Sequence, residues 1–284
     1  MASRDFSWAI PVMRAGYAGR ALVYLAVAGL SLWAIMRGGQ AQGTETALAR
    51  LEGSGWGIAV LVLIALGMGC YAVWRLIDAL YDLECYGTDG KGIIARIGMI
   101  VTGAVHLALG VTVIGVLLNS GSDSGGGSGI AKLAGTVMKW PGGRWIVGIA
   151  GIAVIGAGIY YINKGWAQKY RKHLAANHFT VHWNPALRAG VAAQGIIVAI
   201  IGGFLVFAAM TADPNKAAGV GKVFDWLASQ TFGNILVILI CIGLLGFALF
   251  CAVNAAYKVI PRASGTDIET LAQKLGSKAK RQMS

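Results

Sequence analysis

Arg14-Ala15-Gly16-Tyr17 opens the first long apolar run of the chain, and the pattern returns as Arg96-Ile97-Gly98-Met99 and Arg188-Ala189-Gly190-Val191. A second motif closes each of the three units and consists of a glycine followed by residues four and eight positions later: Gly67, Tyr71 and Arg75; Gly156, Tyr160 and Lys164; Gly246, Phe250 and Asn254. Offsets of four and eight place side chains on one face of a helix. The repetition therefore predicts a helical hairpin written three times.

The composition is that of a membrane protein. Of 284 residues, 56% are hydrophobic and 13% are charged, whereas a soluble domain carries about 25% charged residues. Six apolar runs are long enough to cross about 30 Å of hydrocarbon, over 14–36, 57–84, 94–118, 144–170, 187–211 and 232–260. The 42 glycines favour close contact between spans, because small residues let helix backbones approach. We expect an all-α integral membrane protein with six transmembrane helices.

The order of the spans predicts the arrangement of the repeats. Each unit has two spans, so successive units enter the membrane from the same side, and we expect three parallel two-helix repeats in a quasi-threefold arrangement. The connections on the opposite side hold short apolar patterns over 44–51, 129–140 and 216–226, which predict short interfacial or capping helices. The predicted units are repeat 1 (1–88), repeat 2 (89–178), repeat 3 (179–260) and a basic amphipathic tail (261–284).

Basic residues are concentrated on one side of the predicted bundle. The N-terminus, the turns at 75–96 and 164–188 and the tail from Lys258 carry 17 of the 24 lysines and arginines. The positive-inside rule then places both termini in the cytoplasm of a bacterium, with the spans in its inner membrane. The net charge of +12 is explained by anionic lipid headgroups on the cytoplasmic side. We expect these lipids as partners, a second copy or another membrane protein as a further partner, and no nucleic acid.

The best-preserved motifs resemble those of a known family. Gly16-Tyr17-Ala18-Gly19-Arg20 and the run Ala-Leu-Gly-Met-Gly-Cys-Tyr-Ala-Val-Trp-Arg at 65–75 resemble the bacterial membrane proteins of the domain-of-unknown-function 1206 family. That family is built from three tandem two-helix units, and the resemblance covers nearly the whole chain. Repeats 2 and 3 keep the arginine and glycine positions but lose the tyrosine and the second arginine. The resemblance implies the architecture and no particular activity.

Polar side chains within the apolar runs are the candidate ligand site, because such groups face the bundle interior. Six residues past each opening arginine, roughly 9 Å deeper, lie hydrogen-bonding side chains: Arg20, Thr102 and Gln194. A second layer comes from the even-numbered spans: Arg75, Lys164 and Asn254, with Asp78, Asp82 and Glu84 as counter-charges. Together they predict a positively biased cavity that opens to the cytoplasm. The alternative is that they form interhelical hydrogen bonds, and the opening arginines reach lipid headgroups.

A third layer, ten residues past each opening arginine, is incomplete. It contains Tyr24 and His106, but Val198 occupies the third position. An imidazole at this depth would carry a proton or donate to a neighbouring carbonyl. The apolar Val198 argues against an axial channel through the membrane centre.

Catalytic and metal-binding signatures are missing from the sequence. We find no clustered nucleophile and base and no paired carboxylates within the spans. His173, His178 and His182 are spaced by five and four residues without a cysteine or carboxylate, which makes a weak metal site. The four cysteines are expected to be packed thiols, and no cofactor is expected. The leading hypothesis is a non-enzymatic protein that binds or transports a small polar or anionic solute. The alternative is an accessory or structural subunit that binds lipid, an apolar ligand or a partner membrane protein.

Overall fold

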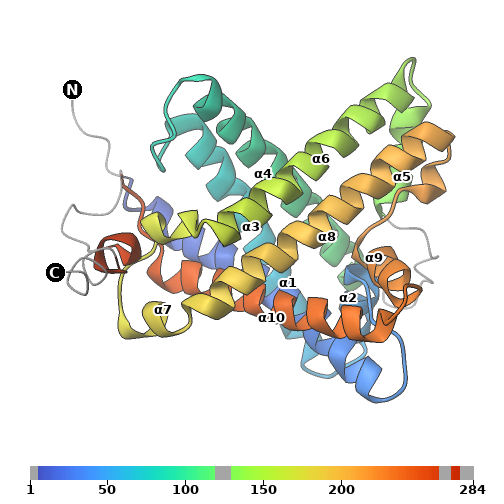
Figure 1. The fold of residues 1–284 in the computed structure, drawn as a ribbon, viewed down its shortest axis with the longest axis horizontal. Helices are drawn as coiled ribbons and strands as arrows, with labels where there is room; N and C mark the ends of the chain where they lie inside the picture. The colour runs from blue at the N-terminus through green and yellow to red at the C-terminus, as the bar shows by residue number, and fades with distance from the viewer. Residues whose placement is uncertain (1–5, 119–128, 262–269, 276–284) are drawn as a thin grey trace.

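The computed structural model describes residues 6–118, 129–261 and 270–275 (Figure 1). Six of the helices in these ranges are long and apolar enough to cross a membrane. They are α1 (Ala9–Met36), α3 (Gly57–Tyr81), α4 (Gly90–Leu118), α6 (Gly143–Trp166), α8 (Asn184–Thr211) and α10 (Gly233–Tyr257). They confirm the predicted multi-pass fold of three tandem two-helix repeats.

The shorter helices lie in the connections. α2 (Thr44–Glu52), α5 (Gly129–Met138) and α9 (Val220–Ala228) join the two helices of each repeat, and α7 (His178–His182) precedes α8. Two single 3-10 turns cover Lys169–His173 and Pro214–Lys216. Leu48 of α2 and Phe224 of α9 are buried against α1, α3 and α10, so α2 and α9 cap the bundle.

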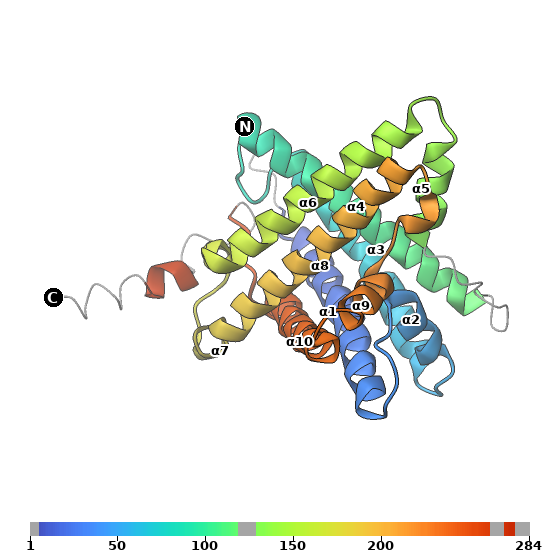
Figure 2. The ribbon, with the colours of Figure 1, turned by 45° about the vertical axis from the view of Figure 1, so that its right-hand side comes forward.

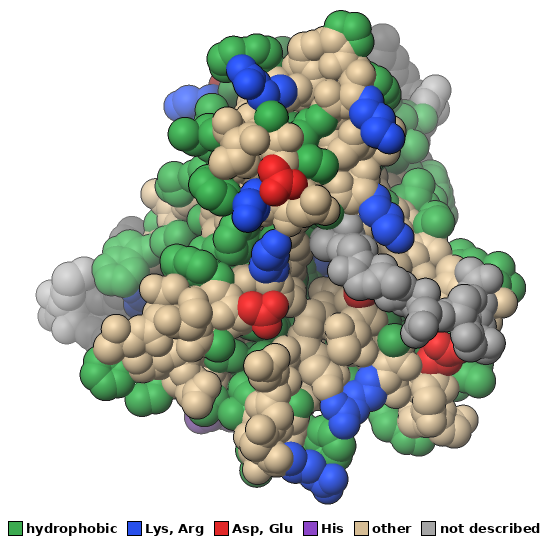
Figure 3. All heavy atoms as spheres, turned by 90° about the vertical axis from the view of Figure 1, so that its right-hand side faces the viewer, with side chains coloured by type: hydrophobic (Ala, Val, Ile, Leu, Met, Phe, Trp, Pro, Cys, Tyr) green, Lys and Arg blue, Asp and Glu red, His purple; other side chains and the backbone are tan. Residues whose placement is uncertain are grey.

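The two ends of the bundle differ in composition. We call the end that carries the start of α1 and the end of α10 the terminal side, and the end that carries α2, α5 and α9 the loop side. On the loop side, basic side chains are dispersed among acidic ones and backbone, with no single basic patch on the face in view (Figure 3). The predicted tail lies largely outside the described residues, but Leu271 is buried in a core cluster with Ala9 and Ile260 on the terminal side.

The long helices pack in the order α4, α3, α1, α10, α8, α6. The helices of repeat 1, α1 and α3, pack on each other, as do α8 and α10 of repeat 3. Repeat 2 departs from this pattern, because α4 packs on α3 and α6 packs on α8. Within the described chain, α4 and α6 share no extensive interface, and they run in different directions in both ribbon views (Figures 1 and 2). The expected equivalence of three hairpins thus holds for the topology and not for the packing.

Glycines explain which helices touch. A Cβ on Gly19 would lie 2.6 Å from the Cα of Gly67, so α1 and α3 meet backbone to backbone. Gly190 and Gly246 make the corresponding contact between α8 and α10. In repeat 2, Gly98 and Gly156 occupy the motif positions, yet a Cβ there would meet nothing within 4 Å.

Replacing Gly19 with leucine should therefore destabilise the protein. The added side chain has no room against Gly67, and overpacking of this kind costs about 1–3 kcal/mol. Gly29 of the same helix is the matched control, because a Cβ there meets nothing within 4 Å. Unfolding by sodium dodecyl sulfate, followed by circular dichroism, should show a loss for Gly19→Leu and little change for Gly29→Leu. Equal stability of the two variants would contradict the close α1–α3 contact.

Candidate functional site

Arg20 is a buried cation in the middle of the bundle. Its residue is 3% exposed, and its Nη1 donates a hydrogen bond of 2.8 Å to the hydroxyl of Tyr71. The guanidinium carbon lies 4.7 Å from the ring centroid of Tyr71, 5.4 Å from that of Phe247 and 5.8 Å from that of Tyr24. Among the described residues, its Nε has no hydrogen-bond partner and no carboxylate forms an ion pair with it. Aromatic faces thus contribute to its electrostatic stabilisation.

The Tyr71 hydroxyl is shared by two guanidinium groups. It also accepts a hydrogen bond of 2.9 Å from Nε of Arg75, one turn further along α3. Arg75 Nη2 donates to the hydroxyl of Tyr17 at 3.4 Å, and the Tyr17 ring packs edge-to-face on Tyr71 with centroids 5.4 Å apart. Because Gly67 brings α1 against α3 one turn away, the motif of glycine, tyrosine and arginine places both guanidinium groups on one acceptor.

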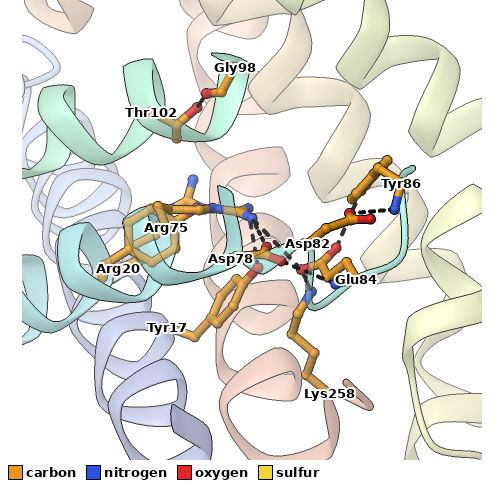
Figure 4. A network of polar contacts seen from close by, with 11 residues as sticks. Tyr17, Arg20, Arg75, Asp78, Asp82, Glu84, Tyr86, Gly98, Thr102 and Lys258 are labelled. Atoms are coloured by element: carbon orange, nitrogen blue, oxygen red, sulfur yellow. Dashed lines mark hydrogen bonds and ion pairs between the residues drawn. The ribbon is translucent and has the colours of Figure 1, made fainter. Parts of the chain in front are cut away.

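Two carboxylates continue the network toward the terminal side (Figure 4). Arg75 Nη1 lies 3.4 Å from Oδ2 of Asp78 and 3.8 Å from Oε1 of Glu84. The same Glu84 oxygen forms an ion pair of 2.8 Å with Nζ of Lys258, the residue after α10. Burial alone would raise the pKa of Glu84, but the charges of Lys258 and Arg75 hold it well below its usual value. This chain of contacts joins repeat 1 to the end of repeat 3.

The turn after α3 holds Glu84 in place. Asp82 has a left-handed backbone with φ of 52°, and its carboxylate accepts the backbone N–H groups of Tyr86 at 2.7 Å and Gly87 at 2.9 Å. The Tyr86 hydroxyl donates to Glu84 Oε2 at 3.3 Å, and its ring stacks on His173 with centroids 6.5 Å apart. Burial lowers the pKa of His173 to about 4, because the effect of Glu84 in the opposite direction is smaller.

The predicted first layer is brought together only in part. Gln194 Nε2 donates to the hydroxyl of Tyr24 at 3.0 Å and so connects α8 to the aromatic group around Arg20, while its Oε1 is buried without a partner among the described residues. Thr102 donates instead to the carbonyl of Gly98 in its own helix. His106 lies with its ring 4.6 Å from that of Tyr71 and its Nδ1 2.7 Å from the carbonyl of Thr102.

The predicted second layer also splits. Arg75 belongs to the network, whereas Asn254 donates to the carbonyl of Phe250 one turn earlier in α10. Lys164 forms no hydrogen bond or ion pair within the described ranges, although it interacts electrostatically with Lys258 and Glu84. The repeats therefore do not contribute equivalent side chains to one symmetric site.

The expected vestibule does not coincide with the cavities found. A cavity of 240 Å³ lies on the loop side between Trp33, Arg37 and Arg50. A second cavity of 370 Å³ lies between residues 167–172 and the tail residues Ala272 and Leu275. Neither contains a member of the predicted layers. Arg20 and Arg75 both bond to Tyr71, Asp78 pairs with Arg75, and none of these residues lines either cavity.

Other predictions concern groups outside this network. No cluster of three metal-ligating side chains occurs in the described part of the chain. His178 stacks on His182, while His173 packs on Tyr86. All four cysteines, which lie within the described ranges, are free thiols. The opening arginines were expected to reach lipid headgroups. Arg96 instead donates hydrogen bonds to the backbone carbonyls of Ala79 and Leu80 at the end of α3.

Sequence reasoning did not select Tyr71, Tyr17 and Lys258 as site residues. Tyr71 carries the clearest signal, since it stands midway between Gly67 and Arg75 in the repeated motif. In the sequence, Lys258 is the first of the basic residues of the tail. Only the folded chain places it beside Glu84.

Replacing Tyr71 with phenylalanine should destabilise the protein strongly. The change keeps the ring but leaves Arg20 and Arg75 without their common acceptor, and hydrogen bonds to charged groups contribute about 1.5–3 kcal/mol each. We expect a loss of roughly 2–4 kcal/mol in denaturant unfolding. The matched control is Tyr257→Phe, at a partly exposed tyrosine. If both variants unfold like the wild type, the shared acceptor has no structural importance.

His173 predicts a pH dependence of stability. Its pKa is about 4 in the folded protein against 6.5 ordinarily, so between these values the unfolded chain binds more protons than the folded one. Stability should therefore fall as the pH decreases from about 6.5 to about 4. Protonation of Glu84 reduces the stability further only as the pH falls below about 4.5, the ordinary pKa of this carboxyl group. Melting temperatures at pH 7, 6 and 5 should decline in the wild type and decline less in His173→Phe, which keeps a ring against Tyr86. Parallel pH profiles would refute the assignment.

The comparisons with known proteins agree with the repeat pattern. The family model described as Domain of Unknown Function (DUF1206) matches three times, at residues 15–82, 97–168 and 189–258. The chain is also similar to "Uncharacterized protein YxxB" of Bacillus subtilis (strain 168), with 26% identity over 249 residues that cover 86% of this chain and 90% of that protein. No solved structure matches. The three matches span most of the chain and follow its three hairpins, so the protein belongs to the DUF1206 family.

Proposed function

We propose that this multi-pass membrane protein binds a small anionic solute at the network centred on Arg20 and that it is not an enzyme. The observation that carries the proposal is the state of Arg20. Its charge is buried at 3% exposure, and within the described residues it interacts with the hydroxyls of Tyr71 and Tyr24 and with aromatic rings but with no carboxylate. A cation in the membrane interior normally pairs with an opposite charge or lines a pathway. An anion at Arg20 would supply that missing charge.

The chemistry of the surrounding groups favours an anion with several oxygens. A guanidinium presents parallel N–H donors that suit carboxylate or phosphate. Gln194 and Tyr24 add a neutral amide and hydroxyl close to Arg20. The carboxylates Asp78 and Glu84 are already engaged by Arg75 and Lys258, so they do not neutralise Arg20.

The distribution of basic residues supports access from the cytoplasm. The N-terminus, the turns at 75–96 and 164–188 and the tail from Lys258 carry 17 of the 24 lysines and arginines, which favours cytoplasmic termini in a bacterial inner membrane. An anion would enter past the Arg75, Glu84 and Lys258 contacts, which must separate to admit it. We further propose that the anion bound at Arg20 is carried across the membrane.

A second candidate function is that of an accessory or structural membrane subunit. Thr102 and Asn254 bond to carbonyls of their own helices, and the cavities found lie away from Arg20. These observations favour a role for the polar side chains in fixing the helices.

Anion-dependent stabilisation tests the binding function. The purified protein is melted in a phosphorus-free detergent with phosphate, sulfate, acetate or chloride at constant ionic strength. A ligand of the folded state adds about 2.7 kcal/mol of stability at a hundredfold excess over Kd. At least one oxyanion should raise the melting temperature of the wild type above its value in chloride, and Arg20→Gln should lose this increase.

Arg144→Gln is the control, because Arg144 is exposed beside Trp145. It should keep the full stabilisation. An equal response in Arg20→Gln and the wild type would place the anion elsewhere and end this proposal. For transport, proteoliposomes loaded with the stabilising anion should release it faster with the wild type than with Arg20→Gln, and no release above empty liposomes would favour the accessory function.

A further inference from the structure

Repeat 2 exposes a helix face that repeat 1 buries. In repeat 1 the face of α3 with Gly67 and Tyr71 packs against α1. The same motif in α6 consists of Gly156, Tyr160 and Lys164. Here Tyr160 is 49% exposed, and a Cβ on Gly156 would meet nothing within 4 Å. Tyr160 interacts with Tyr86 in the turn after α3, but around Gly156 the face that corresponds to a hairpin interface is open in the described chain.

The opposing surface on α4 is open as well. Gly98 stands at the position where Gly16 contacts Tyr71 in repeat 1 and Gly190 contacts Gly246 in repeat 3, yet a Cβ on Gly98 meets nothing within 4 Å. The two helices run in different directions and cross in both ribbon views (Figures 1 and 2). The motif glycines thus mark one open surface on each of the two helices of repeat 2.

The terminal end of this space carries an excess of positive charge. Lys164 lies in the last turn of α6 and has no hydrogen bond or ion pair within the described ranges, while Lys258, Glu84 and Arg75 act on it electrostatically. In this region the cations Arg20, Arg75, Lys164 and Lys258 face the carboxylates Asp78, Asp82 and Glu84. His173, the nearby imidazole, has a lowered pKa and adds no charge at neutral pH. Asp78 is engaged by Arg75 and Glu84 by Arg75 and Lys258, so Lys164 has no carboxylate of its own in the described chain.

We propose that an anionic phospholipid binds sideways between α4 and α6, with its phosphate at Lys164. Gly156 is eight residues from Lys164, about 12 Å along the helix, so an acyl chain passes over it when the headgroup meets the lysine. Headgroups of anionic lipids attract lysine at this depth. A second copy or a partner helix would fill the space without neutralising Lys164. The proposal goes beyond anion binding at Arg20, because it concerns a different surface and a membrane-borne ligand.

Lipid retention measured by native mass spectrometry tests the site. The protein is taken from nanodiscs that contain phosphatidylcholine and phosphatidylglycerol in equal amounts. The wild type should retain one phosphatidylglycerol in preference to phosphatidylcholine. Lys164→Gln should reduce this preference about fivefold, and Gly156→Trp should reduce retention of both lipids. The controls are Lys91→Gln, at an exposed lysine, and Gly203→Trp, at an open glycine of α8; both should behave as the wild type does.

Each other outcome overturns the lipid site. No preference for phosphatidylglycerol in the wild type, or unchanged retention in both Lys164→Gln and Gly156→Trp, contradicts it. A dimer or companion protein that is retained in place of lipid and lost in Gly156→Trp contradicts it too. If inorganic phosphate stabilises the protein through Arg20 but displaces no lipid, only the solute site is supported. The proposal of anion binding at Arg20 and the proposal of a lipid site can therefore be refuted separately. Because Gly156 has open space around it, the tryptophan variant should fold, and its melting temperature checks this.

Discussion

A guanidinium in the membrane interior is costly unless the protein surrounds it with acceptors and polarisable groups. Arg20 is such a group, and the hydroxyl of Tyr71 accepts hydrogen bonds from both Arg20 and Arg75 Nε. This requirement places Gly19 and Gly67 in direct contact, since only backbone-to-backbone packing brings α1 close enough to Tyr71. Glu84 then balances Arg75 and Lys258, which holds the end of α10 against repeat 1. The polar network and the packing of the helices are thus one arrangement.

The three repeats use one motif in three ways. Repeat 1 uses it to bury two arginines against a tyrosine. Repeat 3 keeps the glycine contact, replaces the tyrosine with Phe250 and turns Asn254 back on its own helix. Repeat 2 keeps the glycines but separates its helices, and it leaves Lys164 without an ion pair in the described chain. Divergence between repeats of this kind provides distinct surfaces from one ancestral interface.

Much of the fold follows from the sequence. The six spans and the short helices over 44–52, 129–138 and 220–228 appear where hydrophobic length and periodicity predict them, because both signals are local. The packing order is not local. Gly98 and Gly156 occupy the same motif positions as the glycines that touch in the other repeats. Nothing in the sequence pattern indicates that α4 packs on α3 and α6 packs on α8. Layers of equal depth in the sequence include Asp78, which pairs with Arg75, and the two cations Arg20 and Arg75. Depth alone could not identify Tyr71 as their acceptor or distinguish Gln194, which reaches α1, from Thr102, which bonds within α4.

The most direct test of the central claim is a contact between the Arg20 guanidinium and a bound anion. Solid-state nuclear magnetic resonance can measure the dipolar coupling between ¹⁵N-labelled arginine side chains and the ³¹P nucleus of inorganic phosphate, with the protein in phosphorus-free detergent. The Arg20 signal is assigned by its absence in Arg20→Gln. The account predicts a strong coupling on that signal and none on the signal of exposed Arg144. Phosphate that couples to other arginines but leaves the Arg20 signal unaffected would contradict it.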